Sequence, residues 1–323
     1  MLRKRKIRLA IPALIIVLAV FYLIPQFFKF DKETYRFVSA WGSEGSQSGE
    51  LSGPIGIAID NASFIYVSDA ENNRIQKFTS DGIFVAEWGS EGSELGQLAR
   101  PMHITFSPDG KLYVAEYLND RIQIFDTEGN SLGAIGTTGA EPGQFDAPGG
   151  VGVDREGNIY VADFYNHRVQ KLSKAGKFLS FIGESGRVFS GKLHYPTDIT
   201  LGADGSIYVA DAYNFRVQQF SRTGKFMRKW GSPLGLGIPG VWKGWFKVAT
   251  GTAIDGEGNI YVADFDNHRI QKFSPKGGYI TAFGEAGSGA GQFDRPTDVA
   301  IDSNGRVYVV DFGNNRIQVF QKE

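Results

Sequence analysis

Six copies of one short motif run through most of this chain, and they constrain its fold more than any other feature of the 323-residue sequence. Each copy has an acidic residue, an Asn three positions later and an Arg two positions after that, followed by an aliphatic residue and Gln. Successive arginines are 47, 47, 48, 53 and 47 residues apart. This spacing predicts one closed repeat architecture rather than the two domains that length alone would suggest. The motif residues are Asp69, Asn72, Arg74, Glu116, Asn119, Arg121, Asp163, Asn166, Arg168, Asp211, Asn214, Arg216, Asp264, Asn267, Arg269, Asp311, Asn314 and Arg316.

Each unit also carries the pattern of four short strands. In the first unit these strands are expected at residues 56–59, 65–69, 74–78 and 84–89, with Asp81-Gly82 as a turn between the last two. Four-stranded units of about 40 to 50 residues, repeated six times, predict an all-β, six-bladed β-propeller.

The two ends of the repeat region supply a check on this fold. The last unit ends after its third strand, at residues 316–321, and an unassigned strand lies at residues 37–42, before the first complete unit. Pairing this N-terminal strand with the last unit would complete the sixth blade and remove the exposed sheet edges. We therefore expect the N-terminal strand to close the ring.

On this motif and its six-fold recurrence, residues 36–321 resemble the NHL-repeat family. The resemblance implies a six-bladed propeller but no single function, because the family includes lyases, receptor sensor domains and RNA-binding modules. Its zinc-dependent amidating lyases carry histidines directly after the proline that begins the innermost strand, and no histidine is found there in this chain. The residues at these positions are Ile55, Met102, Gly149, Thr197, Thr250 and Thr297.

The N-terminal segment predicts a membrane anchor. Residues 9–28 are almost entirely apolar, and twenty helical residues span about 30 Å, the thickness of one hydrocarbon core. The basic run at residues 3–8 should stay in the cytoplasm and send the remainder across the membrane. A cleaved signal peptide is the alternative, but the residues after the apolar run are bulky rather than small. We expect a basic tail and a single transmembrane helix at 1–28, a linker at 29–35 and the propeller at 36–323 on the periplasmic or extracellular side of the inner membrane.

Charge and cysteine content exclude several functions. Residues 31–323 contain 28 Lys and Arg against 35 Asp and Glu, so the propeller lacks the cationic surface that nucleic-acid binding requires. The chain has no cysteine, which excludes disulfides, thiolate catalysis and Cys-ligated zinc.

Side chains that recur in every unit are expected to be structural, and those that break the pattern are better functional candidates. The motif Arg can pair with the acid while Asn caps the turn between them. Two residues after the proline position, glycine alternates with His103, Asp198 and Asp298 around the ring. An imidazole and two carboxylates could hold a divalent cation at the channel mouth, and no other cofactor is expected. Alternatively, the two aspartates cap turns and His103 is a solvated channel residue.

One connection between units is longer than the others. From Gly231 to Ala249 it takes 18 residues, whereas the equivalent connections take 12 or 13. Its apolar side chains predict a contact with a partner or a membrane, and the alternative is a loop that folds over the channel mouth and buries itself. Propeller topology places this insertion on the face opposite to the entry of the anchor. The apolar residues are Leu234, Leu236, Ile238, Val241, Trp242 and Trp245.

Together these features favour a membrane-anchored, non-catalytic module that binds or scaffolds a protein partner, for example as an accessory subunit of a larger membrane complex. Two alternatives stay open at this point. One is a metal-assisted hydrolase or lyase that works at the channel mouth, and the other is a sensor domain for an envelope ligand.

Overall fold

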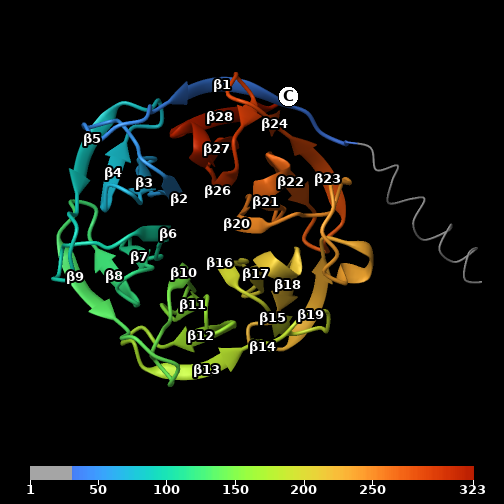
Figure 1. The fold of residues 1–323 in the computed structure, drawn as a ribbon, viewed down its shortest axis with the longest axis horizontal. Coiled ribbons are helices and arrows are strands. Elements are labelled where there is room, and N and C mark those ends of the chain that lie inside the picture. Colours follow the sequence, from blue (N-terminus) through green and yellow to red (C-terminus); the bar gives the residue numbers. More distant parts are fainter. Residues whose placement is uncertain (1–30) are drawn as a thin grey trace, which may run out of the picture.

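The computed structural model describes residues 31–323, so the expected basic tail and transmembrane segment lie outside the described residues. Within 31–323, no helix has the length and apolar character needed to cross a bilayer. This part of the chain forms six four-stranded antiparallel sheets arranged as blades around a central channel (Figure 1). The predicted all-β, six-bladed propeller is confirmed.

The blades follow the chain in order, each running from the channel outwards. Blade 1 contains β2 (Pro54–Ile59), β3 (Ile65–Asp69), β4 (Arg74–Phe78) and β5 (Phe84–Trp88). Blade 2 contains β6 (Pro101–Phe106), β7 (Leu112–Glu116), β8 (Arg121–Phe125) and β9 (Ser131–Ile135). Blade 3 contains β10 (Pro148–Val153), β11 (Ile159–Asp163), β12 (Arg168–Leu172) and β13 (Phe178–Ile182).

The second half of the ring repeats this arrangement. Blade 4 contains β16 (Pro196–Leu201), β17 (Ile207–Asp211), β18 (Arg216–Phe220) and β19 (Phe226–Trp230), and blade 5 contains β20 (Ala249–Ile254), β21 (Ile260–Asp264), β22 (Arg269–Phe273) and β23 (Tyr279–Phe283). Blade 6 contains β26 (Pro296–Ile301), β27 (Arg306–Asp311), β28 (Arg316–Lys322) and β1 (Tyr35–Trp41). Between blades lie the short strands β14 (Glu184–Ser185), β15 (Lys192–Leu193), β24 (Glu285–Ala286) and β25 (Gln292–Phe293), and 3₁₀ turns occur at η1 (Ala212–Asn214), η2 (Pro233–Gly235), η3 (Phe265–Asn267) and η4 (Phe312–Asn314).

The first strand closes the ring, as the sequence predicts. β1 pairs antiparallel with β28, from Tyr35 opposite Lys322 to Trp41 opposite Ile317, with one irregularity between Phe37 and Ser39. In Figure 1 the two ends of the described chain therefore meet in one blade. The pairing leaves no blade with an unpaired third strand, which would otherwise be an exposed sheet edge.

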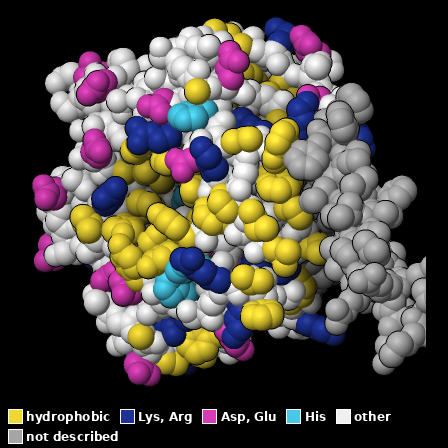
Figure 2. All heavy atoms as spheres, turned by 45° about the vertical axis from the view of Figure 1, so that its right-hand side comes forward, with side chains coloured by type: hydrophobic (Ala, Val, Ile, Leu, Met, Phe, Trp, Pro, Cys, Tyr) yellow, Lys and Arg dark blue, Asp and Glu magenta, His cyan; other side chains and the backbone are white. Residues whose placement is uncertain are grey.

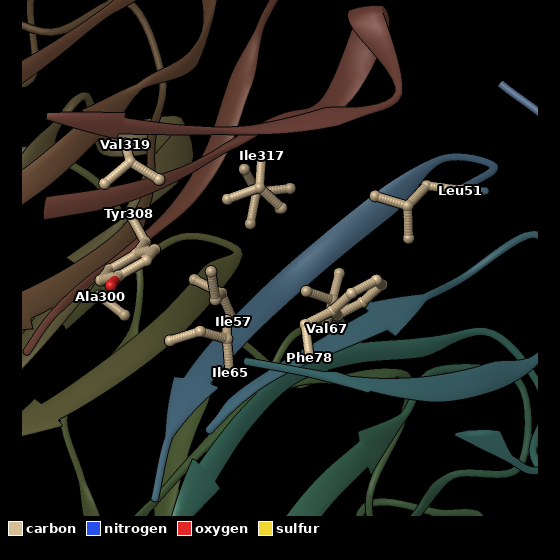
Figure 3. Packing of buried hydrophobic residues seen from close by; sticks show 10 residues of the cluster. Leu51, Ile57, Ile65, Val67, Phe78, Ala300, Tyr308, Ile317 and Val319 are labelled. Carbon is tan, nitrogen blue, oxygen red and sulfur yellow. The ribbon is translucent and has the colours of Figure 1, made fainter. Parts of the chain in front are cut away.

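Packing between neighbouring blades forms the core. β3 is buried along its whole length, whereas the outer strand β5 alternates between half-buried and exposed residues. Figure 3 shows one such interface, in which Ile57 and Ile65 of blade 1 meet Tyr308 and Val319 of blade 6. Because each blade is covered on both sides, its middle strands are apolar at successive positions rather than at alternate ones.

The repeated acid of each blade is a buried hydrogen-bonding centre. In blade 4, the carboxylate of Asp211 accepts hydrogen bonds from Arg216 Nε at 2.7 Å, Asn214 Nδ2 at 2.9 Å and Gln218 Nε2 at 2.8 Å. It also accepts the backbone N–H of His194, in the loop that enters the blade, at 2.7 Å. The same four kinds of donor surround the acid in the other five blades, so the motif ties each blade to its entering loop.

We predict that Arg216→Leu lowers the free energy of unfolding by about 3–5 kcal/mol, because it leaves the Asp211 carboxylate buried without its cation. Both side chains of this pair are fully buried. Urea unfolding measures the change. The control is Arg222→Leu, which breaks an exposed ion pair with Glu156 and should leave the unfolding midpoint nearly unchanged. Equal losses in the two variants would contradict a central role for the buried acid.

Candidate functional site

The central channel opens through a funnel with a cavity volume of about 530 Å³. It lies on the face that carries the loops entering each blade and the turns after each motif acid. The wall of this funnel is mostly aromatic, because these turns project rings toward the channel axis. The rings are those of Tyr117, Phe164, Tyr213, Phe265 and Phe312.

The rings form contacts on two opposite sides of the funnel, and arginines lie over them. Tyr117 and Phe164 meet with their centroids 6.2 Å apart, and the Arg100 guanidinium lies 5.5 Å from the Tyr117 centroid. On the other side, the Arg295 guanidinium lies 5.5 Å from the centroid of Phe312. The Phe312 ring contacts the Phe265 ring of blade 5, with the centroids 6.2 Å apart. Cations above aromatic faces keep both groups oriented at the surface. The rim therefore combines aromatic rings and arginines with the exposed carboxylate of Asp266.

His103 lies at the floor of the funnel and is buried. Its Nδ1 donates to the carbonyl of Gly149 at 3.1 Å, whereas its buried Nε2 has no hydrogen-bond partner. Burial lowers the pKa of His103, but the negative charges of Asp198 and Asp298 outweigh this effect and hold the pKa above its ordinary value.

The two aspartates bind to neighbouring blades. Asp198 Oδ2 accepts hydrogen bonds from the backbone N–H and the hydroxyl of Thr252, each at 2.8 Å. Asp298 accepts the backbone N–H of Ile57 at 2.9 Å and that of Val299 at 2.8 Å. Burial is the main cause that raises the pKa of Asp298 to about 7; the charge of His103 opposes this shift, and the charge of Asp198 adds to it.

The alternation of glycine with these larger residues has a structural cause. Blades 2, 4 and 6 each form a hydrogen bond with the backbone of the next blade in the ring, through the side chains of His103, Asp198 and Asp298 respectively. At the remaining three interfaces, a glycine lets the next blade approach closely: a Cβ on Gly251 would lie 2.6 Å from Asp298 Cα, and Gly56 and Gly150 are equally crowded. The inner ring is thus built from three pairs of blades.

The predicted metal site needs a different arrangement. Within residues 31–323, no three His, Asp or Glu side chains gather in a way that could hold a metal ion. The carboxylates of Asp198 and Asp298 instead serve as hydrogen-bond acceptors between blades. Metal binding by these two residues with His103 stays a prediction from the sequence.

The aromatic wall was not anticipated from the sequence, although a signal for it exists. The residue directly after the motif acid is aromatic in four units, at Tyr117, Phe164, Phe265 and Phe312, and is Ala in the other two. An aromatic residue at a turn is unusual, because turns favour small and polar residues. The acid, Asn and Arg of the motif do not by themselves indicate the aromatic wall.

The insertion exposes five of its six predicted contact residues. Leu234 is 61% exposed, Val241 59% and Trp242 46%, and Leu236 and Ile238 are also exposed. We call these five side chains the insertion patch. Trp245, expected with them, is buried instead, because Gly240 leaves room for its ring: a Cβ on Gly240 would lie 2.3 Å from Trp245 Cε3.

The start of the described chain lies beside the insertion. The backbone N–H of Lys32 donates to the Ile280 carbonyl on β23 at 2.9 Å, so residues 31–34 follow the outer edge of blade 5. Asp31 forms an ion pair with Lys243 of the insertion and accepts the Tyr279 hydroxyl at 2.5 Å. The expectation that the chain enters on the face opposite to the insertion is therefore wrong. The chain first runs along β23 at residues 31–34 and then forms β1.

Comparison with known proteins supports the repeat assignment. The NHL repeat family model matches residues 51–78, 145–172, 193–220, 246–273 and 293–320. The unmatched second unit is the one that carries Glu116 in place of Asp. No curated protein matches the chain.

Solved structures share the fold at low sequence identity. Virginiamycin B lyase from Staphylococcus aureus is 17% identical with a TM-score of 0.60, and covers 89% of this chain and 99% of its own. A gluconolactonase from Xanthomonas campestris is 13% identical with a TM-score of 0.64, and covers 90% and 100%. An auxiliary nutrient binding protein from Bacteroides thetaiotaomicron is 15% identical with a TM-score of 0.65, and covers 90% and 77%. At these identities the likeness shows the fold alone.

We predict that Asp298→Asn flattens the pH dependence of stability between pH 5 and 8. The folded pKa of Asp298 is about 7 against an ordinary value of 3.8, so from pH 5 up to about 7 the folded protein holds a proton that the unfolded chain has already released. The stability of the wild-type protein should therefore fall with rising pH, and the variant should lose part of that slope. Urea unfolding at several pH values measures it, and parallel curves for the two proteins would contradict the raised pKa.

Proposed function

Because the chain is a six-bladed β-propeller built of NHL repeats, we propose that it acts as a non-catalytic binding module, held at a membrane by its N-terminal segment and engaging a protein partner through the funnel. Propellers of this kind serve many functions, so the proposal rests on the site rather than on the fold. The observation that carries it is the funnel itself, with five aromatic rings in its wall and Arg100 and Arg295 over two of them.

The chemistry of the funnel suits a peptide segment. Aromatic walls bury an apolar or aromatic side chain, and Arg100 and Arg295 favour an anionic group at the rim. A loop or chain end of a partner that carries an apolar residue next to an acidic one meets both requirements.

Catalysis is less well supported. The solved neighbours include a lyase, a gluconolactonase and a nutrient binding protein by name, so they point to both binding and chemistry. In this chain Asp198 and Asp298 already accept hydrogen bonds from adjacent blades, and the exposed Asp266 is the single acid among the residues that line the funnel. A general base or nucleophile needs a group that can reach a substrate.

The membrane tether is the second part of the proposal. Residues 9–28 have the length and composition of one transmembrane helix, and the basic residues before them favour an N-terminus inside the cell. The propeller would then sit on the periplasmic or extracellular side, where a partner in a membrane complex, or an envelope ligand, could reach the funnel.

We predict that replacing Phe265 in the funnel by p-benzoylphenylalanine gives a light-dependent adduct with a protein partner in native membranes. Adding Arg100→Glu and Arg295→Glu should reduce that adduct, because an anionic segment would then be repelled. The control places the same photoreactive group at Phe181, which is 44% exposed on the outer strand β13. No adduct, or equal adducts at both positions, would contradict the funnel as the binding site.

We predict that a single cysteine in place of exposed Lys276 reacts with a membrane-impermeant maleimide in intact cells, whereas one in place of Lys4 does not. The native chain has no cysteine, so each variant carries one reactive site. The labelled fraction on a denaturing gel measures this. Labelling at position 4 but not at position 276 would show the opposite orientation. Labelling at neither position would place both residues inside the cell.

A further inference from the structure

We propose that the insertion patch rests on the lipid bilayer, so that the edge of the disc at blades 4 and 5 faces the membrane. This inference depends on the tether in the proposed function and adds the orientation of the propeller to it. It assigns the five exposed side chains to lipid rather than to a protein partner. The partner site remains the funnel.

The patch has the composition of a surface that enters the membrane interface. Its five exposed apolar residues include a tryptophan, the residue type that favours the boundary between headgroups and acyl chains. Residues 232–247 contain Lys243 and Lys247 but no acidic residue, so lipid phosphates would not be repelled. Figure 2, which brings this edge of the disc forward, shows hydrophobic side chains gathered on the surface next to basic ones.

A neighbouring loop extends the apolar surface. Arg216 donates to the carbonyls of Val188 at 2.8 Å and Phe189 at 3.0 Å, and also to Gly235 within the insertion at 3.1 Å. The loop before blade 4 and the insertion are therefore held side by side by one buried guanidinium. Phe189 is 72% exposed and Val188 43%, which adds two apolar side chains next to the patch.

The path of the chain places this surface beside the tether. Asp31 pairs with Lys243, and the apolar run of the sequence ends at Phe28, only three residues earlier. Three residues reach at most about 10 Å, so the end of a transmembrane segment would lie within that distance of the insertion. A bilayer entered at this point would lie close to the insertion that carries the patch. This position favours lipid over a partner protein as the occupant.

Hydrogen bonds hold the backbone of the insertion in place, so the insertion patch has a defined conformation. Arg269 donates to the carbonyls of Val241 at 3.0 Å and of Trp242 and Trp245 at 2.9 Å. Phe246 anchors the end of the loop in the core and is fully buried. An ordered apolar surface loses little conformational entropy when it meets a membrane.

Quenching of Trp242 fluorescence by brominated lipids tests the inference. The full chain is reconstituted into phosphatidylcholine vesicles with and without bromine on the acyl chains, and the emission of Trp242 is obtained as the difference between wild type and Trp242→Phe. We expect the Trp242 emission to fall about twofold in brominated vesicles, because interfacial side chains lie within reach of the upper acyl chain.

The matched control moves the probe to the opposite side of the ring. Leu95 is 61% exposed in the loop that enters blade 2. This loop aligns with the insertion because Gly96 and Gly244 each donate a backbone N–H to the motif Gln of their blade. Leu95 directly precedes Gly96, as Lys243 precedes Gly244. In the variant Trp242→Phe/Leu95→Trp, the new tryptophan should show no quenching.

Unquenched Trp242 in a chain that floats with the vesicles would overturn the inference, as would equal quenching at both positions. A chain that fails to float would overturn it together with the tether. Neither result bears on the adduct formed at Phe265, so failure of this inference and failure of the funnel are distinguishable. Shielding of Trp242 in native membranes, without quenching in vesicles, would assign the patch to a protein instead.

Discussion

The fully buried acid at the end of the second strand of each blade is the interaction on which the rest of this molecule depends. A carboxylate removed from water is costly unless cations and N–H donors surround it, and here Arg, Asn, Gln and a backbone amide do so in every blade. The amide comes from the loop that enters the blade, so the same centre that stabilises the blade also fixes the loops on the face with the funnel. In blade 5, Asp264 and Arg269 hold the insertion in this way. Function is thus placed on loops whose positions are set by buried charge pairs.

Much of this architecture could be predicted from the sequence, because a motif recurring in phase specifies strands, blade number and ring closure together. Contacts between different units were harder to predict. The alternation of glycine with His103, Asp198 and Asp298 suggested a ligand set, whereas the structure shows that these side chains connect adjacent blades, a relation that depends on how the ring packs. Trp245 occupies the position of a half-buried Gln in other units, yet Gly240 allows its ring to turn inward. Four of the five funnel aromatics directly follow the motif acid, and their shared role is apparent only when the turns converge on one axis.

The funnel and the insertion patch both contain apolar and aromatic side chains, but their surroundings differ. In the funnel, half-buried rings are oriented by arginines and surround a buried imidazole, which suits recognition of a specific segment. In the insertion, aliphatic side chains and a tryptophan lie on an open convex edge without a cavity among them, which suits a fluid surface. The two sites lie on one side of the molecule but point in different directions, so a tethered disc can contact a bilayer and still offer its channel mouth to a partner.

Closure of the ring by β1 and β28 also determines when this protein can finish folding. Tyr35, near the start of the propeller, has its strand partner at Lys322, next to the end of the chain, so the sixth blade cannot form until synthesis is complete. Pairing over such a long stretch of sequence is slow, and an open ring exposes strand edges that can pair with other chains. A segment that keeps residues 31–34 against the membrane would hold the first strand at a fixed place while the rest of the chain emerges, and the last strand would then find its partner by returning to the point of entry.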